Sequence, residues 1–159
     1  MKEYNLFRGI PIGGKKDQWI YGSFHKYLPY TPAIDQEPKE DEYQYLIIQD
    51  GFSDWNMPRK LRVIQVYPES VGVYSGIRDE HGVKIFEGDS VRCQPRIMMV
   101  TIEKTIEYYD GFFWATGKDG EPMISLLDLL KRYCIESTSR CAFDQYWNEE
   151  NECYIVTNK

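Results

Sequence analysis

The stretch from Val66 to Arg92 constrains the fold more than any other part of the chain. It reads V-Y-P-E-S-V-G-V-Y-S-G-I-R-D-E-H-G-V-K-I-F-E-G-D-S-V-R, which is the pattern of two short apolar strands joined by a turn. Its glycines mark the places where the strands bend, at Gly72, Gly76, Gly82 and Gly88. Because glycine adopts a positive φ without steric cost, this spacing predicts closely folded β-structure. The stretch contains no nucleophile–base pair and no cluster of metal ligands, so it predicts architecture rather than activity.

Composition favours a β-rich globular protein and argues mildly against one that coats nucleic acid. With 159 residues, the chain is long enough for one compact domain or for a domain with an extension. Aromatic residues make up 15% of it, and such side chains pack well on pleated sheets. Acidic residues outnumber basic ones by 25 to 19, which gives a net charge of −6. Phosphate binding, in contrast, draws on a basic surface.

The cysteines and the N-terminal sequence predict a cytoplasmic protein with reduced thiols. The four cysteines form no Cys-x-x-Cys pair and stand at Cys93, Cys134, Cys141 and Cys153. The N-terminal residues M-K-E-Y-N-L-F-R include no apolar segment of the kind found in secretion signals. No run of residues approaches the roughly 18 apolar residues of a membrane span. We therefore expect the cysteines to be core or surface thiols and not disulfides.

Periodicity along the chain predicts a mainly β (β-rich α+β) fold with one or two short helices. Between residues 99 and 109, apolar and polar side chains alternate as in an antiparallel strand with one wet face. Asp110-Gly111 is a hairpin signal, and residues 118–120 read as a second turn. Residues 124–132 suggest a short helix, with Ser125 as its cap.

These elements predict a small, partly open SH3-like barrel with an N-terminal β-hairpin extension. The expected parts are an N-terminal β extension over residues 1–60, a barrel-like core over 61–139, and a C-terminal tail over 140–159 that is packed or partly mobile. Within the first part, residues 26–42 contain three prolines and an acidic run, so they predict a connecting loop.

One segment imitates a phosphate-binding loop. The residues from Gly9 to Lys16, G-I-P-I-G-G-K-K, satisfy Gly-x-x-x-x-Gly-Lys, but Lys16 stands where Ser or Thr would ligate magnesium. The residues that follow, W-I-Y-G, favour a strand, whereas the motif must open a helix whose amides hold the phosphates. We therefore predict a hairpin loop with its turn at Gly13-Gly14.

The titratable residues form no catalytic pattern. Neither His25 nor His81 has a partner at metal-ligand spacing. Glu87 and Asp89 could share one face of a strand as a carboxylate pair, but Gly88 between them indicates a bend. There, acidic side chains usually bond nearby backbone amides. The structural interpretation is preferred for all four residues, and we predict no catalytic, cofactor-binding or metal-binding residue.

Basic residues cluster weakly in three places: Lys15-Lys16, then Arg59, Lys60 and Arg62, and finally Lys131-Arg132. Trp55 and Tyr67 lie near the second cluster in sequence, so a surface that combines cations with stacking rings can be drawn there. The net charge and the acidic run at 37–42 oppose this interpretation, which leaves a solvated face as the preferred one.

The central stretch resembles the core signature of the YopX family, small proteins encoded by phages and prophages. In that family a Glu-Thr/Ser-Val-Gly segment leads to Gly-Leu/Ile, a turn with Asp and Gly, and then Ile-aromatic-Glu-Gly-Asp with an apolar residue. The matching residues here are Glu69 to Gly72, Gly76-Ile77, Asp79, Gly82 and Ile85 to Val91. Near the start, Phe7-Arg8-Gly9 and Trp19-Ile20-Tyr21-Gly22 are similar to the family's opening segments. The Gly-Asn segment that the family often carries near its end is missing between Cys134 and Trp147.

The resemblance implies a mainly β fold, a phage or prophage origin and a bacterial cytoplasmic setting, and it implies no particular activity. We expect a non-enzymatic accessory protein that works by protein–protein binding, with no cofactor. Its abundant tyrosine and tryptophan and its strand edges predict self-association and binding of a host or phage protein. The alternatives are a β-barrel module that binds nucleic acid and, third, an enzyme whose site joins residues distant in sequence.

Overall fold

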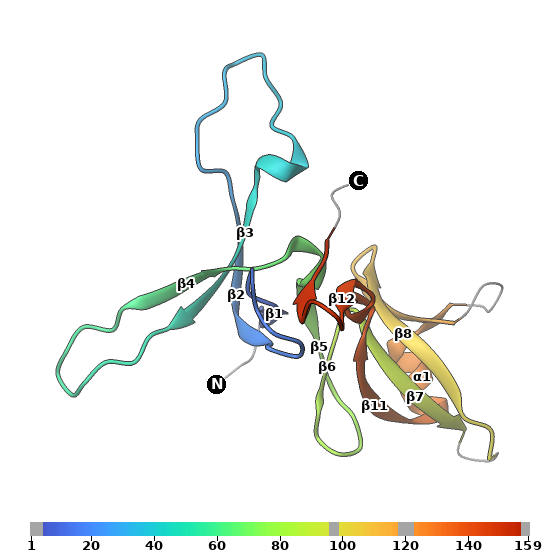
Figure 1. Cartoon of the computed structure of the whole chain (residues 1–159). Helices are drawn as coiled ribbons and strands as arrows, with labels where there is room; N and C mark the ends of the chain where they lie inside the picture. The colour runs from blue at the N-terminus through green and yellow to red at the C-terminus, as the bar shows by residue number, and fades with distance from the viewer. Residues whose placement is uncertain (1–4, 96–98, 118–122, 157–159) are drawn as a thin grey trace. The chain divides into compact units, whose positions relative to one another are not determined.

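The computed structural model describes residues 5–95, 99–117 and 123–156. The chain divides into two compact units, and unit 2 is built from two separate segments (Figure 1). Unit 1 contains Gly72–Trp147, and unit 2 contains Asn5–Val71 together with the residues from Asn148 onward.

Unit 2 is organised around four antiparallel strands in the spatial order β4-β3-β2-β1. They are β1 (Phe7–Gly9), β2 (Ile20–Tyr27), β3 (Gln44–Asp50) and β4 (Leu61–Gln65). Short 3₁₀ turns lie before β3 at Glu40–Glu42 and after β4 at Pro68–Ser70, and the returning C-terminal segment contributes β13 (Cys153–Tyr154). The N-terminal β1–β2 hairpin predicted from the sequence is thus paired with β3 in its own unit.

The unit 2 core lies on one face of these strands. Ile10, Ile47 and Val66 are fully or almost fully buried. The Phe24 ring stacks at 5.3 Å from Phe7 and 5.7 Å from Tyr45, measured between ring centroids. Aromatic pairs at this separation add to the burial of apolar area, so this small core is held by rings as well as by aliphatic side chains.

Unit 1 combines a hairpin with an open five-stranded sheet. The hairpin consists of β5 (Gly72–Arg78) and β6 (Lys84–Phe86), and the sheet has the order β10-β9-β8-β7-β11. Its strands are β7 (Asp89–Pro95), β8 (Ile102–Tyr109), β9 (Phe112–Thr116), β10 (Ile124–Ser125) and β11 (Tyr133–Cys141). A 3₁₀ turn at Ala142–Tyr146 and β12 (Trp147–Asn148) follow.

The helix α1 (Leu126–Arg132) helps to close the core of unit 1. Its Leu126 and Leu129 are buried with apolar residues of the sheet and of β6, namely Ile85, Val91, Cys93, Ile106, Ala115 and Ile135. Ser125 caps the helix by accepting a hydrogen bond from the Asp128 amide, as predicted. A helix this short is marginal in isolation, so burial of its leucines against the sheet must stabilise it.

The mainly β prediction is therefore confirmed, and the open order of the five-stranded sheet agrees with a partly open barrel. The turn at Asp110-Gly111 is also confirmed, with φ of 51° and 80° for the two residues. Both angles lie in the left-handed region that a tight hairpin turn requires. The turn predicted at 118–120 lies outside the described residues.

Candidate functional site

In the loop that imitates a phosphate-binding motif, the backbone amides of residues 12–15 are already bonded within the protein. The N–H groups of Ile12 and Gly14 donate to the carbonyls of Gln65 (3.1 Å) and Pro11 (2.8 Å). The Gly13 N–H donates to the Tyr67 hydroxyl (3.1 Å), and the Lys15 N–H donates to the Gln18 side chain (2.9 Å). The loop leads into β2 and not into a helix. The predicted hairpin loop is confirmed, with Gly13 at a φ of 75°.

Neither histidine belongs to a cluster of functional side chains in the part of the chain that the structure describes. No group of three or more His, Cys, Asp or Glu residues there is arranged to hold a metal ion. His25 lies on β2 beside Tyr27, with 6.3 Å between the ring centroids. His81 lies in the turn after β5, where its Nε2 is 3.6 Å from the Glu136 carboxylate, and Arg92 contacts the same carboxylate at 3.5 Å. This is an exposed charge cluster typical of a solvated surface.

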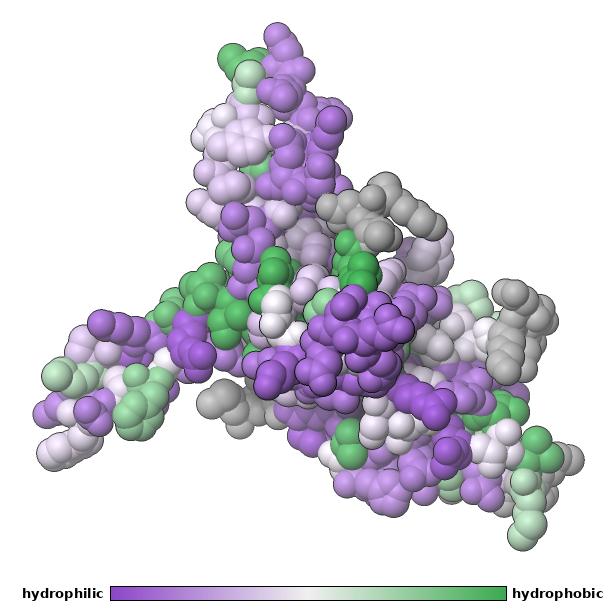
Figure 2. Space-filling view, in the orientation of Figure 1, coloured by the Kyte–Doolittle hydropathy of each residue, from purple (hydrophilic) through white to green (hydrophobic). Residues whose placement is uncertain are grey.

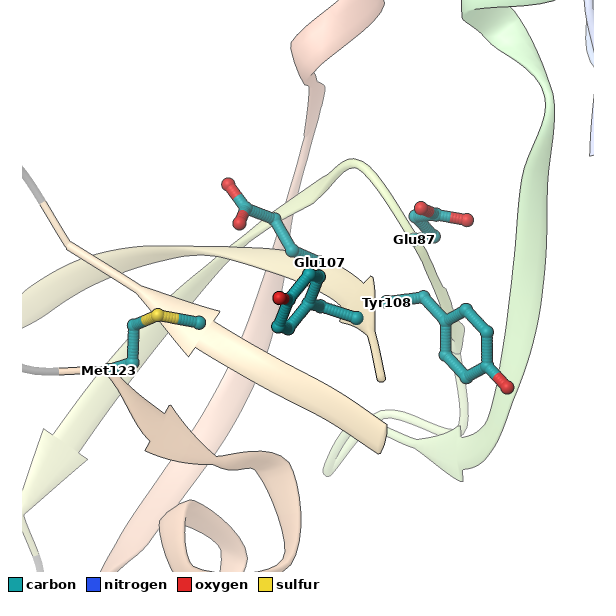
Figure 3. Close-up of a pocket in the computed structure, with 5 residues that line it drawn as sticks. Glu87, Glu107, Tyr108 and Met123 are labelled. Carbon is teal, nitrogen blue, oxygen red and sulfur yellow. The ribbon is translucent and has the colours of Figure 1, made fainter. Parts of the chain in front are cut away.

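Glu87 and Asp89 do not form a carboxylate pair. The buried Asp89 carboxylate accepts a hydrogen bond from the Phe86 amide at 2.8 Å, as the structural interpretation predicts. Glu87 instead lines a shallow hollow of about 450 Å³ with Glu107, Tyr108, Tyr109 and Met123. Figure 3 shows the Glu87 and Glu107 side chains apart from each other, with the Glu107 carboxylate pointing away from Glu87, so the two carboxylates do not converge on one point. Thr116 donates a hydrogen bond to Glu107 at 3.1 Å.

Asp79 is a carboxylate with three backbone donors, and it serves the fold. It is 8% exposed and accepts hydrogen bonds from the backbone amides of His81 (2.9 Å), Val83 (2.8 Å) and Ser137 (3.0 Å). Burial by itself acts to raise the pKa of Asp79, but these amide donors hold its pKa below the ordinary value. Asp79 thereby ties the β5–β6 turn to β11.

All four cysteines are free thiols, as predicted. Cys93 is completely buried in the unit 1 core, and this burial raises its pKa to about 11. Because the thiolate is the reactive form, Cys93 is a core residue and not a nucleophile.

Unit 2 contains a hollow of about 260 Å³ whose lining includes acidic and tyrosine side chains. Two of its lining residues contact the Lys26 ammonium, which lies 2.7 Å from Glu40 and 4.2 Å from the centre of the Tyr43 ring. Tyr45 also donates to Glu40. The Glu40 side chain thus contacts a lysine and a tyrosine of its own unit, and the hollow is a polar surface network.

The arm, residues 51–60, connects β3 to β4 and exposes several large hydrophobic side chains. Phe52 is 91% exposed, Trp55 94% and Met57 66%. Few bonds hold it: Gly51 donates to the Lys60 carbonyl (2.7 Å), Met57 donates to Asp54 (3.0 Å), and Arg59 pairs with Asp50 at 3.8 Å. On the arm, pale green and white patches lie among purple, hydrophilic ones (Figure 2).

The residues of the three predicted basic clusters have different contacts and do not act together. Lys16 pairs with Glu149 at 3.0 Å, and Lys131, on the last turn of α1, pairs with Asp128 at 3.2 Å. Arg59 and Lys60 belong to the arm, as does Trp55, whereas the Tyr67 hydroxyl is used by the hairpin loop. The sequence indicated that aromatic rings and cations lie near each other around Trp55, but it could not show that the rings are exposed.

Comparison with known proteins identifies the family. No curated protein matches the chain, and no solved structure does so. None of the described helices is long and apolar enough to cross a membrane. The family model described as YopX protein matches residues 34–136, a range that includes the arm and the stretch from Val66 to Arg92 but leaves out the similar segments near the N-terminus. Since this match covers more than half of the sequence, the chain belongs to the YopX family.

Proposed function

We propose that this protein is a non-enzymatic, phage- or prophage-derived accessory protein of the bacterial cytoplasm that acts by protein–protein binding through its arm. The observation that carries the proposal is the exposure of Phe52, Trp55 and Met57 together on one short connection. Isolated apolar residues on a surface need no explanation, whereas a contiguous group indicates an interaction site.

The chemistry of the arm fits a protein interface. Tryptophan and arginine are enriched among the residues that dominate binding energy, and methionine adapts to irregular surfaces. Trp55, Met57 and Arg59 follow one another at every second position. A partner that covers these side chains removes a large apolar area from water, which is the main source of affinity in such contacts.

Capture of partners tests the proposal. The tagged protein and a Phe52→Ser/Trp55→Ser variant are expressed in lysogenic or infected bacteria, and proteins bound to each are quantified by mass spectrometry. We expect at least one partner to be enriched with the unmodified protein and depleted about tenfold or more with the variant, in line with the loss of two aromatic anchors.

The matched control is Ile34→Ser, because Ile34 is fully exposed on a different loop of the same unit. This variant should retain the partner. Equal capture by the arm variant, or no enrichment with the unmodified protein, contradicts the proposal.

Self-association is part of the proposal, since the same side chains can bury one another in a second copy. Light scattering behind a sizing column at about 50 µM should show a dimer that Phe52→Ser/Trp55→Ser converts to monomer, because association depends on concentration. A strictly monomeric protein removes this part.

A second candidate is a module that binds single-stranded nucleic acid. The observation in its favour is that the exposed rings of Phe52 and Trp55 share the arm with Arg59 and Lys60, and stacked rings beside cations form such surfaces. It predicts a gel shift at low salt that weakens steeply as salt is added. The absence of any complex with single-stranded DNA or RNA rejects it.

A further inference from the structure

The outer edge of β4 has backbone groups that face away from β3. Within the β3–β4 pair, Gly51 donates to the Lys60 carbonyl and Val66 donates to the Tyr45 carbonyl. Antiparallel strands alternate between residue pairs that bond each other and pairs whose backbone groups point outward. With the observed register, in which Ile48 lies opposite Val63, the N–H and C=O groups of Leu61 and Val63 therefore point to the outer edge.

This open edge is short and has a defined end. β4 is the last strand in its sheet order. At Gln65 the edge is already covered, because Ile12 donates its N–H to the Gln65 carbonyl at 3.1 Å. Among the described residues, no hydrogen bond reaches the outward groups of Leu61 and Val63, so an extended segment could pair with them.

The side chains beside this edge alternate in character. Leu61 and Val63 are 64% and 56% exposed on one face, while Lys60 and Arg62 are exposed on the other. In the described part of the chain, neither Lys60 nor Arg62 has a carboxylate partner, although their neighbour Arg59 pairs with Asp50. A strand that pairs here would meet cations on one face and aliphatic side chains on the other.

A second copy of β4 is a poor occupant of this edge. The antiparallel register that uses all the outward groups of Leu61 and Val63 places Arg62 directly opposite Arg62 of the other copy. Like charges opposite each other destabilise a pair. A register that pairs Val63 with Val63 of the other copy avoids that contact, but it places Leu61 opposite Gln65. The Gln65 carbonyl that this pairing requires already accepts a hydrogen bond from Ile12.

We propose that the β4 edge binds an extended segment of a partner protein in which acidic and apolar side chains alternate. Its carboxylates lie opposite Lys60 and Arg62, its apolar side chains extend the face formed by Leu61 and Val63, and its backbone completes the ladder. The inference rests on the proposed function, since it states the chemistry of a partner that the arm would help to hold.

The test uses a labelled, end-blocked peptide, Thr-Glu-Val-Glu-Val-Glu-Thr, with the full-length protein. Fluorescence anisotropy at low salt should give a Kd of about 0.1–1 mM, as expected for a few backbone bonds and two ion pairs. The same peptide with Lys at each Glu position should not bind in this range, nor should an acidic peptide with N-methylated valines. Equal binding of the acidic and basic peptides, or binding of neither, overturns the proposal.

Variants of the protein locate the contact. Val63→Pro removes only the outward N–H of an edge strand, so it should weaken binding of the acidic peptide about tenfold or more. The variant Lys60→Glu/Arg62→Glu tests the same contact without changing the backbone. It should bind the basic peptide more tightly than the acidic one. Lys131→Glu/Arg132→Glu is the charge-matched control on α1 and should bind as the unmodified protein does. If Val63→Pro folds and binds normally, the edge is not the site.

The two proposals fail separately. If the peptide does not bind while the Phe52→Ser/Trp55→Ser variant still loses its cellular partner, the edge inference is wrong and the proposed function stands. If the unmodified protein captures no partner, the proposed function fails whatever the peptide does.

Discussion

Two of the hairpin connections of this protein are built in opposite ways. In unit 1, the turn between β5 and β6 is held by Asp79, whose carboxylate accepts three backbone hydrogen bonds, one of them from Ser137. In unit 2, the arm between β3 and β4 has few bonds and exposes Phe52 and Trp55 almost completely. The comparison shows that a turn in the most patterned part of the chain is anchored by a buried carboxylate, whereas the arm has few bonds and leaves its aromatic side chains exposed.

The largest expected effect comes from Asp79→Ala. This change leaves three partly buried amide donors without their acceptor, and unsatisfied groups away from water are costly, so unit 1 should lose about 3 kcal/mol of stability. Urea unfolding monitored by hydrogen exchange should show the loss in peptides from unit 1. Glu80→Ala changes the neighbouring exposed carboxylate and should be nearly silent. A silent Asp79→Ala would mean that this turn is no better anchored than the arm.

Gly22→Ala should give the corresponding loss in unit 2. A Cβ at Gly22 would lie 2.2 Å from the Ile48 carbonyl oxygen and 3.0 Å from the Ile47 side chain. Because backbone must move to relieve this overlap, we expect a loss of about 2 kcal/mol. Hydrogen exchange should accelerate in β2 and β3, while Ser23→Ala on the same strand should not affect it. Unchanged exchange in Gly22→Ala would contradict the close packing of these strands.

Acid should weaken the anchored turn before it affects the arm. The pKa of Asp79 in the folded protein lies below its ordinary value of 3.8, so the ionised carboxylate stabilises the fold. That contribution is fully present above the unfolded pKa of about 3.9 and is lost as the pH falls through the lower folded value. Urea midpoints measured from about pH 5 downward should therefore fall less steeply for Asp79→Asn than for the unmodified protein. If the urea midpoints of the two proteins fall equally steeply with pH, Asp79 is not the source of this acid sensitivity.

The smallest effect on stability is expected in the arm. Phe52→Ser/Trp55→Ser removes side chains that contact little of the folded protein, so the free energy of unfolding should change by no more than about 0.5 kcal/mol. Ile47→Ala, in the buried core of the same unit, should cost about 3 kcal/mol. Substantial destabilisation by the arm variant would show that Trp55 packs on its own chain and would remove the basis for a binding role.

Local structure was largely predictable from the sequence because its signals are local. The turn at Asp110-Gly111 and the cap at Ser125 depend on neighbouring residues, and the hairpin loop at Gly13 is closed locally by the bond from Gly14 to Pro11. The similarity of Trp19 to Gly22 to the family's opening segment also has a physical reason, since only glycine fits against Ile48 at that position. The expectation that Asp89 bonds a nearby amide was correct on the same grounds.

Long-range organisation was not predictable in the same way. Asp79 reaches Ser137 across the chain, and no periodicity indicates which distant amide a carboxylate meets. The exposure of Phe52 and Trp55 was equally hidden, because aromatic residues are normally expected to be at least partly buried. Composition could place cations near Trp55, but only the structure shows that these side chains share an exposed connection.

The division of the chain into units has a consequence for its synthesis. Unit 2 needs Tyr154, which is buried, stacks on Tyr67 at 5.9 Å and accepts a hydrogen bond from the Asp17 amide at 3.3 Å. The ribosome completes Gly72–Trp147 before it reaches this residue. The strands of unit 2 must therefore wait, with part of their core open to solvent, while unit 1 is made. Because domains generally fold as they emerge, the unit that begins first in the sequence is expected to finish folding last.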